Sequence, residues 1–147
     1  MQEPFSDEYF MKKALGEARA ALAKGEVPIG AVVVAAGKII ARAHNLTETL
    51  NDVTAHAEML AITATANLLG GKYLNDCTLY ITVEPCLMCA GALAWAQIGR
   101  IVFGADDDKK GFRKFSKKAL HPKTKIEGGI LKQECSVLMT NFFQLKR

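Results

Sequence analysis

Residues 27–43 read Val-Pro-Ile-Gly-Ala-Val-Val-Val-Ala-Ala-Gly-Lys-Ile-Ile-Ala-Arg-Ala, and this stretch decides the fold class. An apolar run at residues 29–34 is followed by the turn-forming pair Ala36-Gly37 and by a returning run at residues 38–43, which predicts a β-hairpin. The first run is apolar on both faces of a strand. We therefore place it inside a sheet that helices cover on both sides.

Helical and strand-like segments alternate along the rest of the chain. Ser6 begins the apolar spacing of an amphipathic helix that ends at Lys24-Gly25, and Thr54 is the expected N-cap of a second helix that ends at Gly70-Gly71. The later elements are a strand at residues 77–83, a helix at residues 86–97 beginning beside Pro85, a strand at residues 100–104, a short strand within residues 125–131 and a helix at residues 134–144 with Val137, Leu138, Phe142 and Leu145 facing inward. We expect one α/β domain over residues 1–147, with three α/β/α layers around a mixed sheet of five strands.

The composition limits the class of protein. Half of the 147 residues are hydrophobic, which is enough for a continuous core without disulfides. Residues 1–10 carry three acidic side chains and no apolar run, which excludes a secretory signal or a transit peptide. The longest apolar stretches are shorter than the roughly 20 residues of a membrane span. We expect a cytoplasmic protein without membrane association.

Positive charge is concentrated late in the chain. The net charge is +4, and residues 109–125 hold eight Lys or Arg residues and His121 but no Asp or Glu. Such a block suits a polyanion such as RNA, and a solvated lysine-rich loop would have the same composition. Phe112 and Phe115 lie within the block, where they could stack on unpaired bases or anchor the segment to the core.

Two short motifs stand at the starts of the second and third predicted helices, His56-Ala57-Glu58 and Pro85-Cys86-Leu87-Met88-Cys89. In the first turn of a helix, Cys86 and Cys89 share one face near free N–H groups that favour thiolates. With His56 they give two thiolates and one imidazole, which neutralise Zn²⁺ and leave a fourth position open, as in catalytic zinc sites. The expected cofactor is therefore Zn²⁺.

Glu58 is the expected proton carrier. It comes two residues after His56, so both side chains can face one site only at the entrance of a helix. A water on catalytic zinc has its pKa lowered to about 7, and a nearby carboxylate can accept its proton and pass it on. The combination predicts hydrolytic attack on an electron-poor carbon.

Each motif alone has weaker interpretations. A Cys-x-x-Cys pair also occurs in redox proteins and in structural zinc sites. A structural site needs a fourth ligand, and the candidates, which lack ligand-like spacing, are His44, His121, Cys77 and Cys135. We expect the last two to be small buried hydrophobic residues. The two motifs together, with 29 residues between His56 and Cys86, favour the catalytic site.

With these motifs the chain resembles the cytidine deaminase superfamily, and within it the bacterial tRNA adenosine deaminases. The likeness extends from Phe10-Met11 to Phe142-Phe143 and is strongest at residues 26–32, 52–58, 78–92 and 98–105. It implies a sheet of the cytidine deaminase type, a zinc-dependent homodimer, and deamination of adenosine to inosine at the wobble position of a tRNA anticodon loop. The alternatives are a deaminase of free guanine, cytosine or a nucleoside, and a non-catalytic RNA-binding zinc module.

The resemblance also assigns substrate contacts. Asn45 matches a base-binding asparagine, Val27 and Val83 match pocket walls, Ala57 matches the residue whose backbone N–H meets the base, and Asp107 matches an acidic residue near the backbone of the flipped nucleotide. Asn45 could instead shape a loop, the valines could be core residues, and Asp107 could belong to a solvated turn. The chain departs from many members at residues 110–124, where they have small residues and it has Phe, Lys and Arg.

Overall fold

The computed structural model describes residues 6–146, so residues 1–5 of the acidic N-terminal segment and residue 147 lie outside the described part. Helices and strands alternate as the sequence predicts, and the basic segment adds one short helix, at residues 112–115, that was not predicted. In chain order they are α1 (Asp7–Ala23), β1 (Gly30–Ala35), β2 (Lys38–His44), α2 (Ala57–Leu69), β3 (Thr78–Val83), α3 (Leu87–Ala96), β4 (Arg100–Ala105), α4 (Phe112–Phe115), β5 (Lys125–Glu127) and α5 (Lys132–Leu145).

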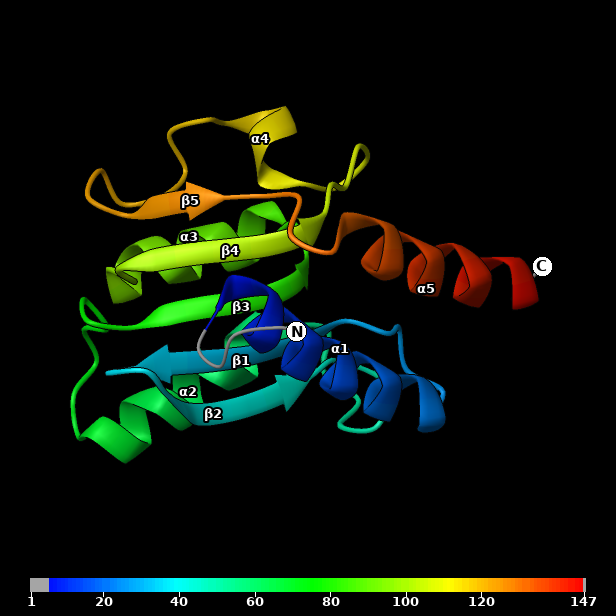
Figure 1. The fold of residues 1–147 in the computed structure, drawn as a ribbon, viewed down its shortest axis with the longest axis horizontal. Coiled ribbons are helices and arrows are strands. Elements are labelled where there is room, and N and C mark those ends of the chain that lie inside the picture. Colours follow the sequence, from blue (N-terminus) through cyan, green and yellow to red (C-terminus); the bar gives the residue numbers. More distant parts are fainter. Residues whose placement is uncertain (1–5, 147) are drawn as a thin grey trace.

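The sheet has five strands in the order β2-β1-β3-β4-β5. β1 is antiparallel to both β2 and β3, whereas β3, β4 and β5 are mutually parallel. Helices α2 and α3 cover one face of this mixed sheet, and α1 and α5 cover the other (Figure 1). The predicted three-layer α/β/α architecture is confirmed.

Strand β1 shows why the apolar hairpin decides the fold. Its side chains alternate between two hydrophobic clusters: Ala31 and Val33 pack on the side of α2 and α3, and Val32 and Val34 pack on the side of α1. All four are buried. A strand between two helical layers has no face for water, so it needs apolar residues at every position.

The strand directions bring distant loops to one edge of the sheet. β2, β3 and β4 run the same way, so the segments that follow them emerge at the same edge. The start of β1 lies there too, because Gly30 pairs with His44 at the end of β2. Ligands bind at the carboxyl edge of open α/β sheets, and every site residue predicted from the sequence lies at this edge.

Two local expectations differ from the structure. The N-cap of α2 is His56 and not Thr54, whose backbone N–H and hydroxyl donate to Asp52. In α5, Phe142 is buried and Leu138 packs against the core as predicted, but Val137 and Leu145 are exposed, because the stripe that faces the sheet runs through Cys135.

No helix within residues 6–146 is both long and apolar enough to cross a membrane.

Candidate active site

The two helices that carry the motifs begin at the candidate ligands themselves. His56 is the N-cap of α2 and Cys86 is the N-cap of α3, both with extended backbone, and neither side chain caps its own helix. An N-cap residue normally turns its side chain back to the first backbone N–H groups. Because these two side chains do not, they are free to point toward each other across the gap between the helices.

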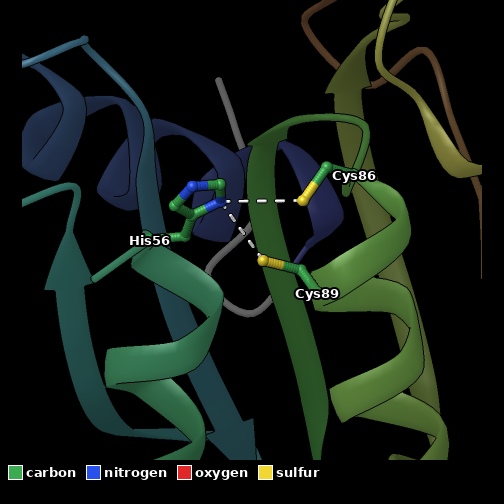
Figure 2. Close-up of side chains that lie close together, drawn as sticks. All are labelled: His56, Cys86 and Cys89. Carbon is green, nitrogen blue, oxygen red and sulfur yellow. Dashed lines mark hydrogen bonds between the residues drawn. The ribbon is translucent and has the colours of Figure 1, made fainter. Parts of the chain in front are cut away.

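The three side chains converge (Figure 2). Nδ1 of His56 lies 3.6 Å from Sγ of Cys86 and 3.5 Å from Sγ of Cys89, and all three candidate ligand atoms lie within 4.8 Å of one another. A tetrahedral zinc ion, with Zn–S near 2.3 Å and Zn–N near 2.0 Å, would place nitrogen and sulfur ligands about 3.5 Å apart. The residues therefore fit zinc as they stand.

No fourth side chain completes this group within the described chain. His44, one of the alternative ligands, is instead hydrogen-bonded to Glu17, and the thiols of Cys77 and Cys135 are buried in the core. The expectation that these two cysteines act as small hydrophobic residues is confirmed. A group of three ligands is the arrangement of catalytic zinc sites, which keep one position for water or substrate.

The two thiols differ in acidity. The hydrogen bond with Cys89, followed by the hydrogen bond with His56, lowers the pKa of Cys86 to about 4. The same contact with Cys86, together with burial, raises the pKa of Cys89, and the hydrogen bond to Cys86 raises the pKa of His56. Metals bind thiolates, so both thiols would have to lose their protons to bind a cation.

Glu58 lies in the first turn of α2 and is buried. Burial, with a smaller contribution from the charge on Cys86, raises the pKa of Glu58 to about 7. His56 and Cys89 also act on this carboxyl group, so Glu58 faces the same space as all three candidate ligands. A carboxyl group with a pKa near 7 can both accept and donate a proton at neutral pH.

Asn45 follows β2 and is buried. Its side-chain amide lies 3.5 Å from Oε1 of Glu26 and 3.4 Å from Oγ1 of Thr47. The fully buried Glu26 also accepts hydrogen bonds from the backbone of Glu48 (3.1 Å) and from the backbone and hydroxyl of Thr49 (both 2.6 Å). Burial opposes the ionisation of Glu26, but these donors outweigh it and lower the pKa. One carboxylate thus holds the loop that carries Asn45.

Asp107 follows β4 and is held by a second buried carboxylate, that of Glu84. The backbone N–H of Asp107 donates to Oε1 of Glu84 at 3.1 Å. Its own Oδ1 accepts from the backbones of Lys109 and Lys110 at 3.1 and 2.9 Å, which is the geometry of a turn. Asp107 therefore shapes a turn at the edge where the metal ligands lie.

The other predicted substrate residues lie at the same edge. Val83 is buried at the end of β3, and Val27 is partly exposed just before β1. Ala57 is the first residue of α2, where a backbone N–H has no partner within the helix. The fold places all five predicted substrate residues at the edge of the sheet where His56, Cys86 and Cys89 converge, and their contacts with a substrate stay predictions.

Three residues that the sequence analysis did not select support these loops: Glu26, Glu84 and Arg113. One signal was present in the sequence. Both glutamates lie next to an apolar strand and within two residues of a proline, as Glu26-Val27-Pro28 and Glu84-Pro85. A lone acidic residue beside a buried strand needs a structural partner.

Relatives of known function cover almost the whole chain. The family model for MafB19-like deaminases matches residues 5–147. A tRNA-specific adenosine deaminase of Aquifex aeolicus (strain VF5) is 46% identical in an alignment 145 residues long that covers 95% of this chain and 95% of the relative. The chain belongs to the tRNA-specific adenosine deaminase family.

Solved structures agree with this placement of the deaminase. A structure from a study of A-to-I editing by tRNA A34 deaminases at the wobble position of transfer RNA matches with a TM-score of 0.83 at 44% identity, covering 88% of this chain and 98% of that chain. A guanine deaminase of Bacillus subtilis matches with a TM-score of 0.66 at 42% identity, covering 69% and 65%. The deaminase has the cytidine deaminase-type fold that the resemblance implied.

Proposed function

We propose that this deaminase converts adenosine to inosine at the wobble position of a tRNA anticodon. The observation that carries the proposal is the convergence of His56, Cys86 and Cys89 beside the buried Glu58, in a chain 46% identical to a tRNA-specific adenosine deaminase. We further propose that residues 1–147 act as one domain, and that the enzyme works in the cytoplasm, where tRNA is used.

The donor set supports zinc as the cofactor. Two thiolates and one imidazole are ligands that zinc prefers, and their spacing agrees with tetrahedral coordination. When bound, zinc supplies a water whose pKa is lowered to about 7, and hence a nucleophile at neutral pH.

Glu58 moves the protons of the reaction. Its carboxylate accepts a proton from the water nucleophile and delivers it to N1 of adenine as C6 is attacked. The carboxylate then takes the proton of the new hydroxyl group on C6 and passes it to the C6 amino group, which departs as ammonia while the C6=O bond of inosine forms. The burial of Glu58 suits this role, because it brings the pKa of the group close to the pH at which it must exchange protons.

The surrounding loops position the base. The adenosine would be turned out of its stack, which costs less in a loop than in a duplex. The amide of Asn45 and the backbone N–H of Ala57 would orient its polar edge, Val27 and Val83 would enclose it, and Asp107 would lie near the nucleotide backbone. The carboxylate of Glu26 supports this assignment of Asn45, because it fixes the asparagine loop before substrate arrives.

The test is a comparison of substrates. Purified, zinc-loaded protein is incubated with an anticodon stem-loop carrying adenosine at the wobble position and, separately, with free adenosine, guanine and cytosine. We expect inosine from the stem-loop. Ammonia released only from guanine would favour the second candidate, a free-base deaminase, to which the likeness to the guanine deaminase structure points.

We also propose a homodimer that forms through the outer surface of α2 and α3. Large apolar side chains are exposed on this surface, namely Leu68, Leu87, Met88 and Trp95, of which Trp95 is 86% exposed. Exposed large apolar side chains on one helical layer are typical of a protein interface. Light scattering should give the dimer mass for the native protein and the monomer mass for Trp95→Glu. A native protein with the monomer mass would contradict the proposal.

A further inference from the structure

The part of the basic segment nearest the site, residues 111–118, forms a strap that is hydrogen-bonded to residues 84–86. We call residues 84–86 the metal-binding turn, because they end in the candidate ligand Cys86. Gly111 forms a β-bridge with Cys86, the backbone N–H of Phe112 donates to the carbonyl of Pro85 (2.9 Å), and the backbone N–H of Arg113 donates to Glu84 (3.2 Å). Three consecutive strap residues therefore follow residues 84–86 in reverse order. This pairing fixes the strap beside a candidate zinc ligand.

The two aromatic residues of the strap point to different environments. Phe112 is 2% exposed and anchors the strap to the protein, whereas Phe115 is 56% exposed. Both belong to the single turn α4, in which the backbone N–H of Ser116 donates to the carbonyl of Phe112 (2.8 Å). Three residues of helix rise only about 5 Å. The ring of Phe115 is thus held in solvent close to the metal-binding turn.

Three lysines around Phe115 have no acidic partner in the part of the chain that the structure describes. Lys114, Lys117 and Lys118 are exposed, and none of them forms an ion pair within residues 6–146. Arg113, by contrast, is bound to Glu84 and Asp106. An exposed aromatic ring among unpaired cations matches proteins that stack an unpaired base and bind its phosphates.

We propose that Phe115 stacks on a nucleobase next to the deaminated adenosine, while Lys114, Lys117 and Lys118 bind the flanking phosphates. This inference rests on the proposed function. Stacking is the role that fits a rigidly placed, exposed ring, because every base has a flat face and no sequence-specific hydrogen bond is required. The strap would thus select an unpaired RNA loop over a free nucleoside.

The experiment measures binding and turnover separately. Dissociation constants for a fluorescent anticodon stem-loop and rates of inosine formation are determined for the native enzyme, Phe115→Ala, Phe115→Trp and the control Tyr73→Ala. Tyr73 is a 54% exposed aromatic residue that precedes β3, at the opposite edge of the sheet. Each protein is also tested on a stem-loop with abasic nucleotides on both sides of the wobble adenosine, and its mass is measured by light scattering.

We expect Phe115→Ala to raise the dissociation constant for the intact loop about 5- to 150-fold, the effect of losing one base–aromatic stack. On the abasic loop, Phe115→Ala and the native enzyme should have nearly equal dissociation constants. Phe115→Trp and Tyr73→Ala should bind the intact loop as tightly as the native enzyme does. Equal losses on both loops, no loss on either, or a change from dimer to monomer would overturn the proposal. If the native enzyme binds the loop without making inosine, the proposed function fails, and the binding comparison still decides the role of Phe115.

Discussion

Glu84 and Arg113 form a two-point ion pair directly beside Cys86, a candidate metal ligand. Nε of Arg113 lies 3.1 Å from Oε2 of Glu84, and Nη2 lies 3.1 Å from Oε1. Glu84 also accepts the backbone N–H groups of Asp107 and Arg113. One buried carboxylate therefore joins the end of β3, the turn after β4 and the strap. Gly111 is required here, because a Cβ at this position would overlap the carboxyl group.

Arg113→Ala should loosen this junction. The substitution leaves the Glu84 carboxylate buried without its cation, which destabilises a protein by several kcal/mol in a fully buried pair. Because the guanidinium is nearly half exposed, solvent screens the loss, and we expect about 1–2 kcal/mol. Urea unfolding checks this value. Arg42 is an exposed arginine of β2, and Arg42→Ala serves as the control. An equal loss in the free energy of unfolding in the two variants would contradict a special role for Arg113.

Glu26 supports the loop that carries Asn45, as Glu84 supports the turn after β4. Glu26→Gln keeps the shape of the side chain but replaces one acceptor oxygen by an NH₂ group that faces N–H and O–H donors. Leaving a buried donor without an acceptor costs about 1–3 kcal/mol. We also expect KM for the stem-loop to rise, because the loop bearing Asn45 loses its support. Glu134→Gln, on the exposed side of α5, should change neither quantity, and an unchanged KM in Glu26→Gln would refute the positioning role.

The sequence predicts α1 and α2 unequally well, for a physical reason. The predicted start of α1 is confirmed: Ser6 is the N-cap, and its hydroxyl accepts the backbone N–H of Tyr9 at 3.0 Å, a purely local contact. Thr54 has the same capping chemistry, but its hydroxyl is bound to Asp52, and the helix begins at His56. Capping preferences describe how a helix satisfies its own N–H groups. They do not register that a metal ligand can occupy the same position.

Long-range polar contacts are a second feature of the fold that the sequence does not reveal. Arg100 at the start of β4 binds Asp7 at the start of α1 through two hydrogen bonds of 2.9 and 2.8 Å, although 93 residues separate them. The apolar pattern places both elements in the fold but carries no information about which charges meet. The strands were predictable because burial on two faces demands apolar residues throughout.

The Asp7–Arg100 pair should make stability depend on pH. The Arg100 guanidinium, with help from the Tyr80 hydroxyl, holds the pKa of Asp7 below its usual 3.8. A carboxyl group with a lowered pKa stabilises the folded state fully above the unfolded value, and this contribution disappears as the pH falls through the folded pKa. We expect Asp7→Asn to lose about 1–2 kcal/mol at pH 7 and almost nothing near pH 2, as measured by urea unfolding.

Tyr80→Phe is the partner variant for this test. It removes one donor to Asp7 and leaves Arg100 in place, so the loss at pH 7 should be smaller and should vanish over the same acidic range. If the difference in the free energy of unfolding between the native protein and Asp7→Asn stays constant from pH 7 to pH 2, the charge on Asp7 does not stabilise the fold.

Because Glu58 is proposed to transfer protons and Cys86 to bind zinc, Glu58→Gln and Cys86→Ser should lose different functions. Glu58 is buried beside the three candidate ligands but is not one of them, so its amide variant should keep zinc and lower kcat about 10²- to 10⁴-fold, the usual contribution of a general acid–base. Cys86 supplies the thiolate of lowest pKa, so Cys86→Ser should lose both metal and activity. Elemental analysis and inosine formation measured on the same samples separate the two effects. Zinc lost from Glu58→Gln would make Glu58 part of the metal site, and full activity in that variant would leave the proton transfers without a carrier.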